Sequence, residues 1–291
     1  MTDTPPSERI IASDYDATIK QHYDRVAQTD KAAPTSTMAD LYVREKETAF
    51  ISSQIAEYTH QRKLKHLDGE QYARKPGNDS KLSVLDVGCG NGYTLERISE
   101  SFPDFDFKGI EFNASLREIA AKRFLKKDIP ISEGDIRILS SLPQKKCDIL
   151  ICQRVIINLL DATDQKTALS NLVEIVNPKG LLIFIECLKS GLANLNSARS
   201  EFELGELPPA HHNLYLEDDF FSHPSLKEFD NSKLEGFSTH YFVSRVLHPT
   251  FLNGNKPDFV RNSHFVSFFS QALPDSIGKY SPLKLFAFTK L

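Results

Sequence analysis

The chain has 291 residues, of which 40% are hydrophobic and 25% are charged, and its formal net charge is −4. This composition is that of an ordinary soluble globular protein, and the length suffices for one large domain or a domain with an added cap. The slightly acidic balance argues against a polyanionic partner, so we expect no nucleic acid as a main substrate.

No segment of the sequence predicts a membrane association or a metal centre. Residues 1–8 are polar and acidic, unlike a secretory signal, and the most apolar run, residues 181–188, is too short to span a bilayer. We therefore expect a cytoplasmic protein with no membrane partner. The four cysteines form no C-x-x-C pair and no Cys/His cluster, so we expect neither a disulfide nor a metal site; they are Cys89, Cys147, Cys152 and Cys187.

Residues 1–80 are predicted to form an N-terminal helical lid and a linker. A short helix is expected over residues 15–27, and a longer one over residues 39–67, where apolar side chains recur at helical spacing. Residues 66–80 form a hydrophilic linker that contains Pro76-Gly77. The core is expected to begin after this linker.

Residues 81–190 are predicted to form the cofactor-binding core. Five strand–helix repeats follow one another there, which is typical of a parallel sheet covered by helices on both faces. The expected strands are residues 83–87, 106–111, 130–133, 147–153 and 181–186.

Residues 191–291 are predicted to form a cap and substrate region whose last two strands complete the core sheet. The regular alternation of strands and helices ends after residue 189, and the two last strands are expected at residues 239–245 and 283–290. An insertion between them, residues 248–281, includes an expected helix over residues 259–271. The cap therefore comes from insertions after the fifth and sixth strands.

The stretch Val84–Gly92 reads as an apolar strand that enters a glycine-rich turn before a helix. Gly88, Gly90 and Gly92 allow a sharp bend and a close approach of a ligand to the backbone, and the helix presents free N–H groups there. The glycine spacing differs from that of a dinucleotide fingerprint. Asp86, two residues before the first glycine, would repel a pyrophosphate but would favour a cationic cofactor.

This D-x-G-x-G-x-G stretch resembles the first motif of the class I S-adenosylmethionine-dependent methyltransferases, and the resemblance extends over about residues 82–186. It implies S-adenosyl-L-methionine as cofactor and a small-molecule methyl acceptor. It also implies a Rossmann-like, doubly wound, mostly parallel α/β sheet of seven strands, preceded by N-terminal helices.

Ligands in such a sheet lie beyond the carboxyl ends of the strands. Glu111 follows the second strand, where a carboxylate accepts hydrogen bonds from both ribose hydroxyls. The resemblance implies that Asp135 contacts the adenine amino group and that Gln153 lines the sulfonium side. The predicted cofactor-binding residues are Asp86, Gly88, Cys89, Gly90, Glu111, Phe112, Gly134, Asp135, Ile136 and Gln153, with Tyr23 and Arg44 added from the N-terminal helices.

The acceptor is less defined by the sequence. The stretch that follows the fourth strand, Gln153–Ile156, departs from the Asn/Asp-Pro-Pro-Tyr/Phe motif of nucleobase and glutamine methyltransferases, which argues against those substrates. Asn158 stands where many small-molecule methyltransferases have a histidine, and we assign it no catalytic role.

The catalytic residues are expected in the cap. We predict His212 as the general base, since imidazole accepts a proton near neutral pH. Tyr241 and Arg245 would orient the acceptor from one face of the expected sixth strand, and Arg199 or Arg245 would pair with an anionic group on it. O-methylation of a natural product or metabolite is favoured; sugar or glycan methylation, N-methylation, a non-catalytic cofactor-binding role and a homodimer stay open.

Overall fold

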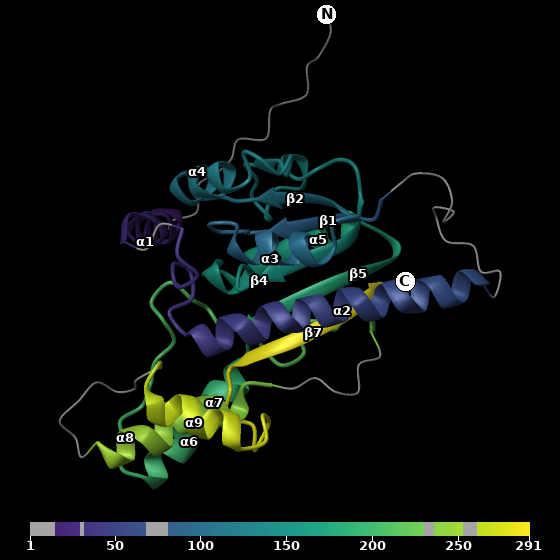
Figure 1. The fold of residues 1–291 in the computed structure, drawn as a ribbon. Helices are drawn as coiled ribbons and strands as arrows, with labels where there is room; N and C mark the ends of the chain where they lie inside the picture. Colours follow the sequence, from purple (N-terminus) through teal and green to yellow (C-terminus); the bar gives the residue numbers. More distant parts are fainter. Residues whose placement is uncertain (1–14, 30–31, 68–80, 230–235, 253–260) are drawn as a thin grey trace, which may run out of the picture.

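The computed structural model describes residues 15–29, 32–67, 81–229, 236–252 and 261–291. A seven-stranded sheet in the order β3-β2-β1-β4-β5-β7-β6 forms its centre (Figure 1). The strands are β1 (Ser83–Val87), β2 (Asp106–Ile110), β3 (Ile131–Ser132), β4 (Cys147–Gln153), β5 (Val176–Cys187), β6 (Leu226–Glu228) and β7 (Leu283–Lys290).

All neighbouring pairs from β3 to β5 are parallel, and β7 runs antiparallel between β5 and β6. The prediction of a doubly wound, mostly parallel seven-stranded sheet is therefore confirmed. The strand order reverses between β1 and β4, which places the expected ligand crevice at the carboxyl ends of these two strands.

The central strands are buried on both faces because helices cover the sheet on both sides. Residues 149–152 of β4 and residues 181–185 of β5 are all 0% exposed. The covering helices are α2 (Leu41–Leu67), α3 (Tyr93–Ser101), α4 (Ala114–Arg123) and α5 (Ala162–Glu174). Helix α2 runs along β5 and β7 and also contacts α3 (Figure 1).

Helix α1 (Asp16–Thr29) lies beside α4 at the edge of the sheet (Figure 1). Both expected N-terminal helices are therefore present, whereas most of the expected linker, residues 68–80, lies outside the described residues. None of the helices among the described residues carries an apolar stretch long enough to cross a membrane.

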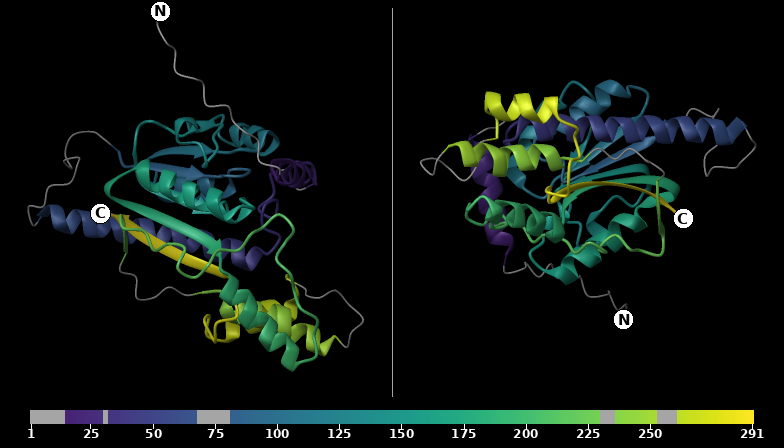
Figure 2. Two further views of the ribbon diagram at one scale, coloured as in Figure 1. Left: turned by 180° about the vertical axis from the view of Figure 1, so that it is seen from behind. Right: turned by 90° about the horizontal axis from the view of Figure 1, so that it is seen from below.

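The cap helices gather at one end of the molecule, beyond β5 and β7 (Figures 1 and 2). They are α6 (Lys189–Glu201), α7 (Ser238–Phe242), the π-helix η3 (Val243–Leu247), α8 (His248–Phe251) and α9 (His264–Ala272). Helix η3 contacts the other four. Helix α6 follows β5 and the other cap helices follow β6, as the expected insertions after strands five and six require.

One predicted strand is wrong: residues 239–245 form α7 and the start of η3, and the sixth strand is the short β6. Ser238 to Tyr241 and Val243 to Val246 are all buried, so this segment is enclosed on every side rather than on one face. The fifth strand also begins earlier than predicted, at Val176, and Lys179 within it adopts a φ of 62°.

Candidate active site

The glycine turn after β1 has a left-handed backbone. Gly88, Gly90 and Gly92 have φ values of 67°, 57° and 79°, a region in which a side chain is strained. A Cβ atom on Gly88 would lie 2.4 Å from Val155 Cγ2. The amides of Gly88 and Cys89 donate to the Ile110 carbonyl at 2.8 and 3.0 Å, which ties the turn to the end of β2.

The carboxylate of Glu111 links the glycine turn to the start of α4. Its Oε2 accepts a hydrogen bond from the Gly90 amide at 2.8 Å, and its Oε1 accepts one from the Asn113 amide at 2.7 Å. Asn113 in turn caps α4 by accepting from the Leu116 amide at 2.9 Å. Burial raises the pKa of the Glu111 carboxyl, and these amide hydrogen bonds oppose the shift.

Asp86 and Arg44 are a buried acid and a buried base beside this turn. Burial, with the neighbouring Glu111 carboxyl as the second cause, raises the pKa of Asp86 to about 8, while Arg44 opposes this. Arg44 on α2 donates to Thr94 Oγ1 at 3.3 Å and to Thr37 Oγ1 at 2.5 Å. Its Nε is buried without a hydrogen-bond partner among the described residues, so one donor is left for an anionic ligand group.

A first cavity opens at these residues. All but one of the predicted cofactor-binding residues line this cavity. Those that line it are Asp86, Gly88, Cys89, Gly90, Glu111, Phe112, Gly134, Ile136, Gln153, Tyr23 and Arg44. The exception is Asp135. The structure thus brings residues from the glycine turn, from the ends of β2, β3 and β4 and from both N-terminal helices into one cavity.

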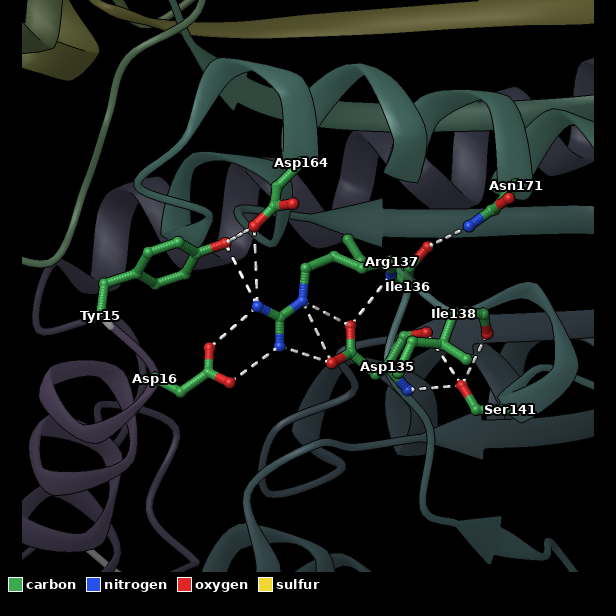
Figure 3. Close-up of polar contacts among 9 residues, drawn as sticks. All are labelled: Tyr15, Asp16, Asp135, Ile136, Arg137, Ile138, Ser141, Asp164 and Asn171. Carbon is green, nitrogen blue, oxygen red and sulfur yellow. Dashed lines mark hydrogen bonds and ion pairs between the residues drawn. The ribbon is translucent and has the colours of Figure 1, made fainter. Parts of the chain in front are cut away.

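Asp135 instead binds Arg137, which fastens α1 to the core (Figure 3). The Arg137 guanidinium contacts Asp135 Oδ2 at 2.6 Å and both carboxylate oxygens of Asp16 at 2.9 and 3.1 Å. Asp164 on α5 lies 3.7 Å from the same guanidinium and accepts a hydrogen bond from the Tyr15 hydroxyl. One arginine therefore joins the start of α1, the loop after β3 and α5.

The turn after β4 has a left-handed residue that is not glycine. Arg154 has a φ of 55°, which is unfavourable for a bulky side chain. Glu186, at the end of β5 and 0% exposed, holds this turn by accepting from the amides of Val155 and Ile156 at 3.0 Å each and from Ile157 at 3.3 Å. Burial raises the pKa of Glu186 to about 7.

Glu47 on α2 binds both side chains at the end of β4. It forms an ion pair with Arg154 and accepts a hydrogen bond from Gln153 Nε2 at 2.6 Å. The sequence does not identify Glu47, because a single carboxylate in a long helix carries no motif. Glu186 does carry a signal, since it is an acid at the end of an apolar core strand.

A second cavity adjoins the first and shares Tyr23, Thr37, Arg154 and Asn158 with it. The three predicted catalytic residues line this second cavity and not the first: His212, Tyr241 and Arg245. Asn158, for which the sequence predicts no catalytic role, donates from Nδ2 to the Tyr23 hydroxyl at 2.9 Å. Its Oδ1 is buried without a hydrogen-bond partner among the described residues.

Tyr241 and Arg245 lie on α7 and η3 rather than on a strand. They are neighbours on consecutive helical turns, with the Arg245 guanidinium 3.8 Å from the centroid of the Tyr241 ring. Arg199 lines neither cavity; it is 1% exposed and donates to the backbone carbonyls of Gly205 and Arg245. It therefore supports the Arg245 backbone and faces neither cavity.

The second cavity has an excess of positive charge. Among the described residues that line it, the guanidiniums are Arg154, Arg245 and Arg261, and the one carboxylate is Asp40. Asp40 Oδ2 lies 2.8 Å from Nε2 of His240. Burial, together with His22 and His211, lowers the pKa of His212 to about 4, so this imidazole is neutral at pH 7.

Comparisons with known proteins identify the domain around the glycine turn. A family model described as a methyltransferase domain matches residues 84–180. The chain is 27% identical over 113 residues to a malonyl-[acyl-carrier protein] O-methyltransferase of Halalkalibacterium halodurans. The aligned stretch covers 38% of this chain and 41% of that protein. The enzyme of the same name from Bacillus anthracis is 27% identical over 124 residues, or 43% and 44% of the two chains. The chain thus matches less than half the length of these relatives.

Two solved structures share the fold over most of the chain. The N-methyltransferase NodS from Bradyrhizobium japonicum, in complex with S-adenosyl-L-homocysteine, matches with a TM-score of 0.50 and 15% identity. The match covers 93% of this chain and 97% of the NodS chain. Magnesium protoporphyrin IX methyltransferase from Synechocystis, with the same molecule bound, has a TM-score of 0.50 and 12% identity, with coverage of 95% and 96%. Residues 84–180 therefore match a methyltransferase domain, and the chain shares the Rossmann-like fold of these two methyltransferase structures.

Proposed function

We propose that the chain transfers a methyl group from S-adenosyl-L-methionine to a carboxylate oxygen of a small-molecule acid. The observation that carries this proposal is the pair of adjoining cavities. One is built on the glycine turn, the other is rich in arginine, and Tyr23, Thr37, Arg154 and Asn158 line both. A donor and an acceptor held there would meet at these shared residues.

The first cavity fits the cofactor because its lining residues offer hydrogen-bonding and charged groups that match those of the cofactor. S-adenosylmethionine, when bound, supplies a methyl carbon activated by a sulfonium. Arg44 has a buried Nε that would donate to the cofactor's carboxylate, and Glu111 retains acceptor capacity for ribose hydroxyls. Asp86 would stabilise the positive charge of the cofactor. The positive φ of Gly88 and Gly90 lets the backbone approach the ligand closely.

The second cavity suits an acceptor that is already an anion. Arg245 and Arg261 line it with positive charge, and guanidinium groups bind carboxylates well; Arg154, which also lines it, is already paired with Glu47. A carboxylic acid is ionised at neutral pH and needs no base. His212, whose pKa is lowered to about 4, would be a weak base toward a hydroxyl. The partial relatives named above as O-methyltransferases support an oxygen acceptor.

A hydroxyl acceptor is the second candidate, because His212 lines the second cavity as the predicted general base would. In that case the imidazole accepts the hydroxyl proton and Tyr241 and Arg245 orient the acceptor. Methylation of a carboxylate at pH 7 releases no proton, whereas methylation of a hydroxyl or an amine releases one. The two candidates are therefore distinguishable in solution.

The test combines turnover with proton counting. The purified chain is incubated with S-adenosylmethionine and matched sets of carboxylic acids, alcohols and amines of the same carbon skeleton. S-adenosylhomocysteine is measured by mass spectrometry, and released protons by an indicator dye in weak buffer. We expect turnover with acids and no proton release. Failure to bind S-adenosylmethionine would overturn the methyltransferase assignment, whereas turnover of alcohols or amines alone would overturn only the acid acceptor.

A variant pair tests the acceptor site itself. Arg245→Gln should raise the KM for the acid by about 10-fold or more, since a charge-assisted hydrogen bond is worth roughly 1.5–3 kcal/mol, and should leave cofactor affinity unchanged. Arg97→Gln on α3 is the matched control, because the Arg97 side chain is 53% exposed and lines neither cavity. An unchanged KM in Arg245→Gln would remove this arginine from the acceptor site.

A further inference from the structure

Three histidines from two distant parts of the chain meet beside the second cavity, and two of them, His22 and His212, line it. His22 lies on α1, while His211 and His212 lie in the segment that follows α6. One ring nitrogen from each lies within 4.8 Å of those of the other two. The rings of His22 and His212 are stacked with centroids 3.6 Å apart, and the His211 ring lies 5.5 and 5.0 Å from them.

We propose that His22, His211 and His212 bind one divalent transition-metal ion of the zinc class. Zinc binds imidazole nitrogen at about 2.0–2.1 Å in a tetrahedral arrangement, and three histidines leave one position for water. To bind one ion, the nitrogen atoms would have to close in from their present separations of up to 4.8 Å by rotation of the imidazole rings. His211 is exposed, so solvent reaches the open position.

One charged side chain near the cluster opposes metal binding only weakly. Arg25 has the same sign of charge as the cation, but it is exposed, so its charge is largely screened by solvent. A metal binds imidazole in its neutral form, which offers a lone pair.

His212 also has an unsatisfied nitrogen. Its Nδ1 is buried and has no hydrogen-bond partner among the described residues. A buried polar atom in this state costs roughly 1–3 kcal/mol. If Nδ1 of His212 is the ligand atom, coordination of the metal would remove this cost. If Nε2 is the ligand atom, coordination would instead reorient the His212 ring.

Both sides of the cluster are anchored without a metal. The segment that carries His211 and His212 is held by the Asn213 amide, which donates to the Ala210 carbonyl at 2.8 Å, and by the Leu214 amide, which donates to Ile157 at 2.7 Å. On the other side Tyr23, next to His22, accepts from Asn158 at 2.9 Å. The two segments that carry the ligands are therefore held near each other, and the ion would fasten α1 to the cap segment.

The experiment uses the full chain without a purification tag, after treatment with a chelator. Zn²⁺ is titrated calorimetrically, and Co²⁺ is titrated as a spectroscopic substitute whose visible absorption reports tetrahedral nitrogen ligands. We expect one ion per chain. His22→Gln and His211→Gln should each weaken Zn²⁺ binding by about 10-fold or more, as loss of a ligand exceeds the 10–100-fold effect of losing an outer partner. His60→Gln is the matched control, because His60 is exposed on α2.

Hydrogen exchange gives a readout that is independent of methyl transfer. Zn²⁺ should slow amide exchange within α1 (Asp16–Thr29) in the parent chain and not in His22→Gln, whose folding is checked by circular dichroism. The metal site is overturned if Zn²⁺ binds without one-to-one stoichiometry at micromolar concentration. It is equally overturned if His22→Gln or His211→Gln binds as tightly as the His60→Gln control.

Discussion

Glu47 on α2 forms an ion pair with Arg154 at the end of β4, and the Glu47 side chain is 0% exposed while that of Arg154 is 14% exposed. The pair fixes the side chain of a residue that lines both cavities. Glu47→Gln would leave the guanidinium without its counter-charge in a mostly buried site. We expect the free energy of unfolding to fall by about 2–3 kcal/mol, measured by urea denaturation.

Glu45→Gln is the control for this change. Glu45 lies on the same helix but bonds the Tyr93 hydroxyl at the surface. Its substitution should stay within about 0.5 kcal/mol of the parent. Equal effects of the two substitutions would show that the Glu47–Arg154 pair contributes nothing particular to the fold.

Glu111→Ala should weaken binding of S-adenosylhomocysteine by roughly 2–4 kcal/mol, measured by calorimetry. It should also lower stability by about 1–3 kcal/mol, because the amides of Gly90 and Asn113 lose their acceptor. The sequence alone does not predict the effect on stability, because it places Glu111 simply at a strand end. Glu133→Ala, at a side chain 71% exposed, should change neither quantity.

The raised pKa of Asp86 predicts that the stability of the fold depends on pH, which can be measured without knowing the acceptor. Its pKa is about 8 in the folded chain, against 3.8 as the ordinary value, so the folded state holds a proton that the unfolded state releases. Stability from this group is full below about pH 4 and is lost as the pH rises toward 8. Asp86→Asn should therefore have a melting temperature that varies less over this range. A parallel pH profile in parent and variant would contradict the shift.

Cofactor binding should release a proton for the same reason. A cationic ligand beside Asp86 stabilises the carboxylate form and lowers its pKa. Affinity should then rise with pH up to about 8, and calorimetry in buffers of different ionisation enthalpy should detect the proton at pH 7. In Asp86→Asn the buffer dependence should disappear.

Arg137→Ala should loosen α1. The substitution removes the contacts to Asp16 and Asp135, and α1 supplies part of the first cavity. We expect cofactor affinity to fall about tenfold, since charge-assisted hydrogen bonds are worth roughly 1.5–3 kcal/mol, and amide exchange in α1 to accelerate. Arg97→Ala, which removes an exposed pair with Glu100 at 3.8 Å, should affect neither. Unchanged exchange in α1 would mean that other contacts hold the helix.

His212→Gln separates the two acceptor classes. With a carboxylate acceptor, kcat should stay within a few-fold of the parent; with a hydroxyl acceptor, it should fall by about 100-fold or more and lose its acidic limb in the pH profile. His22→Gln is the matched control, since it disrupts the same histidine cluster but leaves His212 in place. A base role requires that only His212→Gln loses activity.

The sequence predicts the core strands well because their signals are local. The predicted bounds of β1, β4 and β7 agree with the structure, since each strand is a clear apolar run next to a turn signal. The prediction of the sixth strand is wrong because residues 239–245 include Thr, Tyr and Val, which favour strands, while burial on all sides removes any helical periodicity. The true β6 is three residues long, too short for a pattern to identify.

The residues of the site likewise divide into those that the sequence can identify and those that it cannot. The glycine turn and Glu111 could be found because their spacing is set within one strand–turn–helix unit. Arg137 and Glu47 could not, because their partners lie far along the chain: Asp16 is 121 residues from Arg137, and Arg154 is 107 residues from Glu47. Such pairs depend on how α1 and α2 dock onto the sheet, and no local pattern contains that information.

Helix α1 forms part of the wall of both cavities. Asp16 and Ile19 line the first, Val26 and His22 the second, and Tyr23 lines both. A movement of α1 away from the core would open both cavities at the same time. Release of the spent cofactor and release of the methylated product would then be one concerted event, and the opening rate of a single helix would set an upper limit on the turnover number.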